Sequence, residues 1–350
     1  MGKDSLTVIE KKAEKLAAEK PLLEVKNLKT YFTISSGKLK GEKKYLKAVD
    51  DVSFYVNPGE TLGIVGESGC GKSTTGNSII RLVEPTAGEV FYEGKNIIGM
   101  SHKQFKPYKK NIQMIFQDPF SSLNPRMRVT DIIAEPLKTH KICKGKQLEK
   151  RVNGLMETVG LDPELASRFP HEFSGGQRQR IGIARAIALN PDLIICDEPV
   201  SALDVSIQAQ ILNLLNRLQE ELGLTYIFIA HGIPAVKYVS DRIAVMYMGE
   251  IVEMADKDEL FETTLHPYTD KLISAVPSTD PKNRTIVNED AVADELNQEE
   301  TEVMGCKFSS RCPLAREHCR KVRPELRELK PGHFVKCHYP LKSETLEERR

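Results

Sequence analysis

Nine consecutive residues carry the most specific chemistry of this chain, and they read Gly66-Glu67-Ser68-Gly69-Cys70-Gly71-Lys72-Ser73-Thr74. An apolar run at 62–65 precedes them, and a helix-like run at 73–82 follows. A glycine-rich turn between a strand and the start of a helix lets backbone N–H groups approach phosphate oxygens closely. Lys72 adds a positive charge, and the Ser73 hydroxyl can coordinate Mg²⁺. The spacing therefore predicts a nucleoside triphosphate site rather than a glycine-rich turn with an incidental lysine.

Two carboxylates end another apolar run, which covers residues 193–196. A carboxylate at the end of a buried parallel strand can lie beside a phosphate loop, where Asp197 would help to hold Mg²⁺. Glu198, the next residue, could polarise the attacking water as a general base. The alternative is an acidic pair that begins a surface loop, and the phosphate loop elsewhere in the chain makes it the weaker interpretation.

A third group is Ser174-Gly175-Gly176-Gln177, which precedes a helix-like run at 178–189. Backbone N–H groups at a helix N-terminus attract anions, so these residues could hold a phosphate. Taken alone the motif is weak, because turns of serine and glycine are common before helices. The spacing does not indicate whose phosphate it would hold.

Segments with strand and helix patterns alternate around these motifs, and this alternation predicts an α/β fold. From 117 to 189 the pattern is helical, with turn signals between the helices. The expected strands lie at 22–25, 49–56, 60–65, 89–92, 112–116, 193–196, 225–230, 242–246 and 250–254, the last two as a hairpin. Helices are expected at 147–159 and 207–222, with a short helical run at 266–277.

The composition excludes some classes of function. The chain has 350 residues, of which 40% are hydrophobic and 28% charged, as in ordinary soluble proteins. Its net charge of +1 argues against nucleic acid as a partner. No apolar run approaches the roughly 18 residues that span a membrane, and residues 1–20 lack the apolar core of a secretory signal. We therefore expect a cytoplasmic chain that reaches a membrane only through partner proteins.

Taken together, the motifs resemble those of ABC transporter ATPase domains. Residues 66–73 match Walker A, and 194–198 match Walker B. Residues 174–177 resemble the signature motif, with Phe173 in place of the usual leucine. The resemblance implies a P-loop NTPase fold, in which a mostly parallel sheet carries an antiparallel β subdomain and a helical subdomain at about 118–190.

Three further residues carry the resemblance. Gln117 looks like the Q-loop glutamine, Asp204 ends a D-loop-like run Ser201-Ala202-Leu203-Asp204, and His231 looks like the switch histidine. The family implies that Gln117 and His231 contact the γ-phosphate and that Gln117 lies at the Mg²⁺ site. Gly232 departs from the pattern, because close relatives usually carry aspartate after the switch histidine. We therefore expect His231 to keep its contact with the γ-phosphate but to lack the neighbour that usually supports the orientation of its ring.

Such ATPase domains work as head-to-tail pairs, with each nucleotide between Walker A of one chain and the signature motif of the other. The family stacks adenine on an aromatic residue near the end of the first strand, which by position is Phe32. Tyr31 and Tyr45 remain possible, because residues 33–47 look like an insertion in that loop. An aromatic side chain there could equally be part of ordinary packing.

Four of the seven cysteines cluster near the C-terminus, with the spacing C-x5-C-x6-C-x17-C. Thiols this close in a cytosolic chain favour a soft metal or an iron–sulfur cluster. Zinc is the alternative metal, nearby histidines (His318, His333 and His338) could substitute as ligands, and unligated thiols are a third interpretation. The clustered residues are Cys306, Cys312, Cys319 and Cys337.

The same region resembles the C-terminal extension of the oligopeptide, dipeptide and nickel group of ABC importers, through His266–Thr269 and the run from Gly305 to Ala315. Some members of that group bind a [4Fe–4S] cluster at such cysteines, so the resemblance favours iron–sulfur over zinc. The run from Gln113 to Met127 looks like the F-type ATP-binding subunit of the group. The implied partners are a D-type ATP-binding subunit, two membrane permeases and an extracytoplasmic peptide-binding protein.

These observations predict three parts, namely a polar extension at 1–20, an ATPase domain at 21–265 and a C-terminal extension at 266–350. The extension contains an acidic stretch at 289–302. The expected function is ATP hydrolysis that energises peptide import at the cytoplasmic face of the membrane. The alternatives are import of nickel or another small cargo, or a regulatory subunit with low turnover.

The expected site residues fall into three sets. The catalytic set is Glu198, His231 and Gln117, and the Mg²⁺ set is Ser73, Gln117 and Asp197. The residues expected to bind ATP are Phe32, Gly66, Glu67, Ser68, Gly69, Cys70, Gly71, Lys72, Ser73, Thr74, Gln117, Asp197, Ser174, Gly175, Gly176, Gln177 and Asp204.

Overall fold

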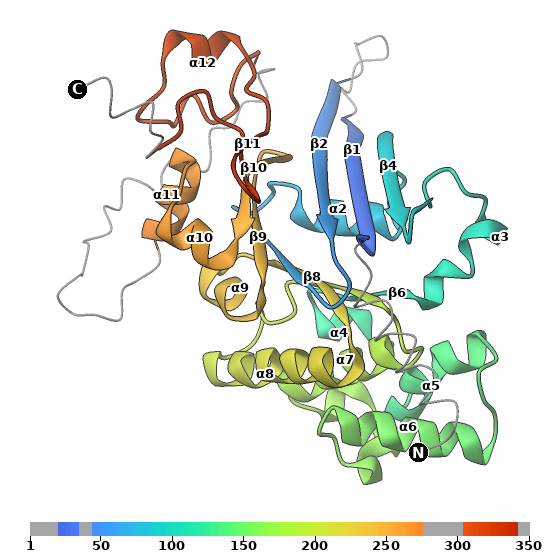
Figure 1. Cartoon of the computed structure of the whole chain (residues 1–350). Helices are drawn as coiled ribbons and strands as arrows, with labels where there is room; N and C mark the ends of the chain where they lie inside the picture. The colour runs from blue at the N-terminus through green and yellow to red at the C-terminus, as the bar shows by residue number, and fades with distance from the viewer. Residues whose placement is uncertain (1–19, 35–43, 276–303, 342–350) are drawn as a thin grey trace.

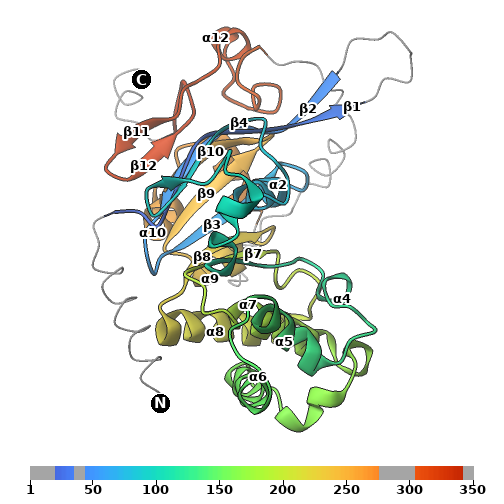
Figure 2. The ribbon, with the colours of Figure 1, turned by 90° about the vertical axis from the view of Figure 1, so that its right-hand side faces the viewer.

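The computed structural model describes residues 20–34, 44–275 and 304–341 (Figure 1). Nearly all of the predicted N-terminal extension and the whole acidic stretch at 289–302 lie outside the described residues. Two sheets organise the described chain. Figures 1 and 2 show the smaller sheet and the main helical group at opposite ends of the molecule.

The main sheet has eight strands in the order β11-β12-β10-β9-β3-β8-β7-β6. Its centre is parallel, because β3 pairs with β8 and β9, and β7 pairs with β6 and β8. Every residue of β3, β7 and β8 is buried, as expected for strands covered on both faces. The strands are β3 (Thr61–Val65), β6 (Ile112–Ile115), β7 (Leu193–Asp197), β8 (Thr225–Ala230), β9 (Arg242–Tyr247), β10 (Glu250–Asp256), β11 (Arg327–Lys330) and β12 (His333–Val335).

The smaller sheet is antiparallel, in the order β2-β1-β4-β5. Alternate side chains of the parallel strands pack toward it, so that Ile64 and Ile229 share a core with Val52. Its strands are β1 (Leu23–Ile34), β2 (Lys44–Val56), β4 (Ala87–Tyr92) and β5 (Lys95–Asn96). The α/β fold with an antiparallel subdomain, expected from the sequence, is therefore confirmed.

Helices cover the other face of the main sheet. Phe228 of the sheet, Ile133 of α5 and Ile183 of α7 belong to one continuous core. Figure 2 shows α5, α6 and α7 grouped below the strands. The longer helices are α5 (Val129–Thr139), α6 (Lys146–Thr158), α7 (Gly175–Ile187), α8 (Val205–Leu222), α9 (Ile233–Val239) and α11 (Pro267–Ser274). Helix α2 (Lys72–Ile79) instead lies between the two sheets, where its Ile79 joins the core of the smaller sheet. Shorter helices are α3 (His102–Phe105), α4 (Pro119–Ser122), α10 (Lys257–Glu262) and α12 (Glu317–Lys321).

The described part of the C-terminal extension is joined to the main sheet, which the sequence did not indicate. β12 pairs with β10, and Glu253 lies opposite Val335. The Glu253 carboxylate is fully buried and accepts hydrogen bonds from the backbone N–H groups of Leu265 and His266 at 2.7 and 2.9 Å. The ring of His333, also fully buried, lies 2.8 Å from the same carboxylate. One side chain of β10 thus fixes both the entry to α11 and the added strand.

A second buried carboxylate, Asp50, ties β2 to the extension. It accepts a hydrogen bond from the Tyr31 hydroxyl at 2.7 Å and pairs with Lys307 at 3.0 Å and Arg323 at 2.6 Å. Burial raises the pKa of the Asp50 carboxyl, but the Tyr31 hydrogen bond and the two cations outweigh burial and hold it below the ordinary value of 3.8. The carboxylate form therefore stabilises the folded chain at neutral pH.

Replacing Asp50 with asparagine should lower the free energy of unfolding by about 2 kcal/mol at pH 7, because Lys307 and Arg323 lose one of the two buried carboxylates that they share, the other being Glu250. The loss should shrink as the pH falls below 3.8, since the wild-type carboxyl is then protonated in the unfolded chain and, at lower pH still, in the folded one. Urea unfolding at pH 7 and pH 3 measures both effects. Asp51→Asn is the control, because Asp51 is exposed. Equal losses for the two variants would contradict the assignment.

Candidate functional site

The phosphate loop lies between β3 and α2, as the sequence predicted. Gly71 caps α2 with a φ of 103°, and a Cβ there would lie 2.1 Å from the carbonyl oxygen of Ala48. Only glycine fits this turn. Lys72 is 4% exposed, and its ammonium donates hydrogen bonds to the carbonyl oxygens of Gly66 at 2.8 Å and Glu67 at 2.9 Å. The loop therefore holds its cation at the N-terminus of a helix, where anions bind well.

Ser73 and Asp197 meet beside this loop. The Ser73 hydroxyl donates a hydrogen bond of 2.8 Å to a carboxylate oxygen of Asp197 at the end of β7. Burial raises the pKa of Asp197, and the bond from Ser73 opposes that shift. A hydroxyl and a carboxylate in contact form the oxygen donor set that Mg²⁺ prefers, and a bound dication would favour the ionised carboxyl. These two residues therefore fit the metal that the phosphate loop implies.

Glu198 is the point at which the three expected catalytic residues meet. It is 4% exposed, and its carboxylate accepts a hydrogen bond of 2.7 Å from the Gln117 amide. The His231 Nε2 atom lies 2.6 Å from the other carboxylate oxygen. The backbone of Glu198 has a φ of 48°, in a region that is strained for residues other than glycine. Strands β6, β7 and β8 run parallel and adjacent, so their C-terminal ends bring these side chains together.

Gly232 follows His231 and caps α9 without a side-chain hydrogen bond. A Cβ at this position would approach only the Pro234 side chain, at 4.0 Å. Its φ of −82° is ordinary for any residue. Neither space nor backbone geometry demands glycine here, and the contact between His231 and Glu198 forms without an aspartate at 232.

The signature-like residues begin α7, three residues earlier than the sequence predicted. Ser174 and Gln177 form a reciprocal capping box, with bonds of 3.3 and 2.9 Å. A Cβ on Gly176 would lie 2.5 Å from Ile207 of α8, so the two helix starts approach closely. Asp204 caps α8 with no side-chain bond. Among the described residues, no hydrogen bond joins 174–177 to the phosphate loop.

The three candidate adenine platforms differ in their surroundings. Tyr31 is occupied by its hydrogen bond to Asp50, whereas Phe32 is 40% exposed and Tyr45 is 53% exposed. Phe32 lies opposite Leu46, and Tyr45 lies opposite Thr33. Phe32 and Tyr45 therefore point to opposite faces of the β1–β2 pair, because successive side chains alternate.

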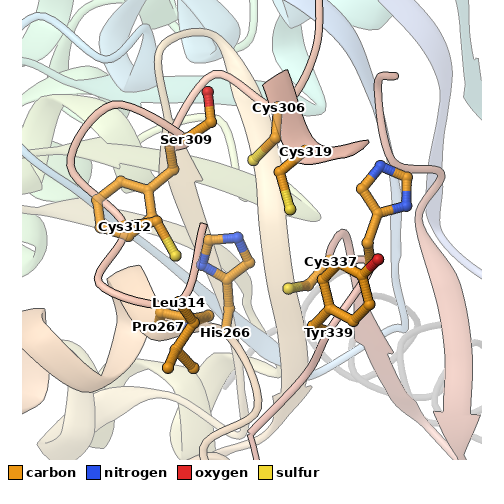
Figure 3. A pocket seen from close by; sticks show the side chains of 11 residues that line it. His266, Pro267, Cys306, Ser309, Cys312, Leu314, Cys319, Cys337 and Tyr339 are labelled. Carbon is orange, nitrogen blue, oxygen red and sulfur yellow. The ribbon is translucent and has the colours of Figure 1, made fainter. Parts of the chain in front are cut away.

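The clustered cysteines line one cavity of about 20 Å³ in the extension (Figure 3). Figure 3 shows their side chains around the ring of His266. His338 also lines the cavity, whereas His333 is committed to Glu253. Burial raises the pKa of three of the thiols, Cys337 to about 12, so they are protonated near neutral pH. In the described part of the chain, no three His, Cys, Asp or Glu side chains are grouped closely enough to hold a metal ion.

Known families and proteins are similar to this chain in sequence and in structure. The ABC transporter family profile matches residues 49–201, and the profile of the oligopeptide/dipeptide transporter C-terminal region matches 252–319. The oligopeptide transport ATP-binding protein AppF of Bacillus subtilis is 50% identical, over 92% of this chain and 98% of its own. The oligopeptide transport ATP-binding protein OppF of Escherichia coli is 52% identical, over 91% and 96%.

The chain belongs to the ABC transporter ATP-binding proteins. It is an ATPase of that family, with ATP and Mg²⁺ as its ligands. A dimeric ATP-binding cassette solved in a post-hydrolysis state with ADP and phosphate has a TM-score of 0.61 and 28% identity, over 67% of this chain and 98% of that one. Within residues 20–34, 44–275 and 304–341, no helix has the length and apolar composition of a transmembrane span.

Two residues of the extension touch the phosphate loop of this ABC ATPase and were not predicted from the sequence. Arg311 forms two hydrogen bonds with the Glu67 carboxylate, at 2.8 and 2.9 Å. The Tyr268 hydroxyl accepts a hydrogen bond of 3.0 Å from the Glu67 backbone N–H. No spacing rule links positions more than 200 residues apart. The available signal was that both residues fall in the short runs, 266–269 and 305–315, that carried the resemblance to importer extensions.

Proposed function

We propose that this chain is the ATP-hydrolysing subunit of an importer of oligopeptides or dipeptides. The observation that carries the proposal is the Glu198 carboxylate, held from two sides by Gln117 and His231. The Ser73–Asp197 contact at the same edge of the sheet supports it. The peptide cargo rests on the names of the two relatives described above, both of which are oligopeptide transport ATP-binding proteins.

In this proposal the loop N–H groups and Lys72 bind the triphosphate. Ser73 and Asp197 would hold Mg²⁺, and the bound ion would neutralise phosphate charge. Glu198 accepts a proton from the attacking water. The water oxygen bonds to the γ-phosphorus while the bond to the β–γ bridging oxygen breaks, which yields ADP and phosphate. Gln117 and His231 orient the reacting groups, and Phe32 stacks on the adenine.

We further propose that Ser174, Gly175, Gly176, Gln177 and Asp204 act on the nucleotide of a second chain. No hydrogen bond among the described residues joins 174–177 to the phosphate loop of the same chain, which is consistent with this role. The ATP-binding cassette of similar structure that was solved with ADP and phosphate is a dimer. The second chain would be a D-type ATP-binding subunit. Two membrane permeases and an extracytoplasmic peptide-binding protein would complete the transporter at the cytoplasmic face of the membrane.

Co-expression with the permease subunits and partner ATPase, followed by purification in lipid nanodiscs, tests the assembly. Peptide-loaded binding protein should stimulate ATP hydrolysis several-fold over the unloaded form. Stimulation by nickel-loaded protein instead would assign the alternative cargo. A chain that binds ATP but shows no stimulated turnover with any partner would be the regulatory subunit.

For the cysteine cavity we propose a [4Fe–4S] cluster, with zinc as the alternative. Four thiols around one cavity support a soft metal. The thiols are not grouped as ligands in the described chain, so binding must draw them together. We also propose that the C-terminal extension that contains these cysteines begins at residue 266, where the ATPase domain ends.

Cys312→Ser should remove most of the iron and the visible absorption of anaerobically purified protein, because one of four thiolate ligands is lost. Cys143→Ser is the matched control, since Cys143 is a buried thiol in the core of the helical group. Metal analysis and absorption spectra measure the outcome. Colourless, zinc-loaded wild-type protein would exclude the cluster and leave zinc.

A further inference from the structure

Every polar group of Glu67, in the phosphate loop, has a partner. Its carbonyl oxygen accepts a hydrogen bond from Lys72, and its backbone N–H donates to the Tyr268 hydroxyl. Its carboxylate receives both arms of the Arg311 guanidinium, at 2.8 and 2.9 Å. Paired contacts of this kind between arginine and a carboxylate are among the strongest and most directional hydrogen bonds in proteins.

The partners of Glu67 are themselves fixed. Tyr268 is 2% exposed, and its ring packs on Tyr247 and Phe308 at centroid distances of 4.6 and 5.4 Å. The Arg311 backbone is held at both ends, because its N–H donates to Phe308 and its carbonyl oxygen accepts from Lys271, each at 3.1 Å. The C-terminal extension therefore offers a preformed cation to the loop.

The contact between Arg311 and Glu67 compensates a negative charge in the phosphate loop. Glu67 places a negative charge in a loop that must bind a triphosphate, and like charges repel. Its side chain is 28% exposed, so solvent screens the charge only in part. Arg311 neutralises the carboxylate through two hydrogen bonds. The backbone carbonyl oxygen of Glu67 accepts a hydrogen bond from the Lys72 ammonium. By fixing Glu67, the Arg311 contact therefore also helps to position Lys72.

We propose that Arg311 and Tyr268 are positioning residues of the nucleotide site, by which the C-terminal extension sets the affinity of the phosphate loop for ATP. The proposal rests on the proposed role of residues 66–74 as the triphosphate site. Arg311 lies between Cys306 and Cys312, so the loop that contacts Glu67 is also part of the wall of the cysteine cavity.

Arg311→Met should raise the KM for ATP about fivefold with kcat within about twofold, because one unit charge beside the triphosphate becomes uncompensated. Arg311→Lys should raise the KM less than Arg311→Met does, because lysine keeps the positive charge but cannot form the paired hydrogen bonds of arginine. The double variant Glu67→Gln/Arg311→Met should return the KM toward wild type, because the unpaired carboxylate is gone. A merely structural role for Arg311 would not produce that recovery.

Lys321→Met is the matched control, since it removes an exposed ion pair with Glu317 from the same segment. Nucleotide affinity and metal content are measured on the full chain with its transporter partners. An unchanged KM in Arg311→Met, or a double variant as weak as the single one, would overturn the proposal. If Lys72→Ala also leaves ATP affinity unchanged, the triphosphate site itself is wrong, which is a distinct failure.

Discussion

Replacing Glu198 with glutamine should lower the rate of ATP hydrolysis by about 10²- to 10³-fold while ATP still binds. Glutamine has nearly the shape of glutamate and can still contact Gln117 and His231, so the arrangement at the end of β7 should persist. An amide cannot accept the proton of the attacking water. The effect should therefore fall on kcat, and the KM should change little.

The measurement is steady-state ATP turnover of the assembled transporter, together with equilibrium binding of a fluorescent ATP analogue. Glu220→Gln is the control, because Glu220 is exposed on α8. Its kcat should match wild type. Unchanged turnover in Glu198→Gln would remove the carboxylate from catalysis, and loss of nucleotide binding would make Glu198 a binding residue instead.

The central strands were predictable because burial leaves a direct trace in sequence. Strands β7 and β8 are fully buried and read as unbroken or nearly unbroken apolar runs. In β11, by contrast, all four residues, Arg327–Lys330, are exposed. β12 has three residues, too few to show a period. Their place in the sheet depends on pairing with β10, which no local pattern encodes.

The start of α7 shows a local conflict of signals. Gly175 and Gly176 are poor helix formers, so the pattern favoured a helix from 178. The capping box between Ser174 and Gln177 overrides this preference and begins the helix at Gly175. The tight approach of Gly176 to Ile207 gives a packing reason for a glycine at that position.

The site was predictable where topology brings it together. Gln117, Glu198 and His231 follow three adjacent parallel strands, and the ends of such strands share one edge of the sheet. No comparable rule of topology predicts the contacts that the C-terminal extension makes with the phosphate loop. Arg311 and Glu67 meet through the packing of Tyr268, Tyr247 and Phe308, a tertiary arrangement that single-sequence patterns do not contain.

Replacing Lys72 with alanine should weaken ATP binding by about 100-fold, because the loss of two charge-assisted hydrogen bonds expected from its ammonium to phosphate oxygens costs about 1.5 kcal/mol each. The side chain is buried with its ammonium on two loop carbonyls, so its charge is positioned before nucleotide arrives. This variant and Glu198→Gln should therefore fail differently, one in binding and the other in turnover.

Calorimetric titration with ATP and Mg²⁺ measures the loss of affinity in Lys72→Ala, and thermal unfolding shows that the fold persists. Lys72 is 4% exposed, and removal of its buried ammonium relieves the cost of desolvation, so the unfolding temperature should not fall by more than a few degrees. The exposed Lys95→Ala on β5 is the control for loss of one positive charge. Wild-type affinity in Lys72→Ala would contradict the placement of the triphosphate at residues 66–74.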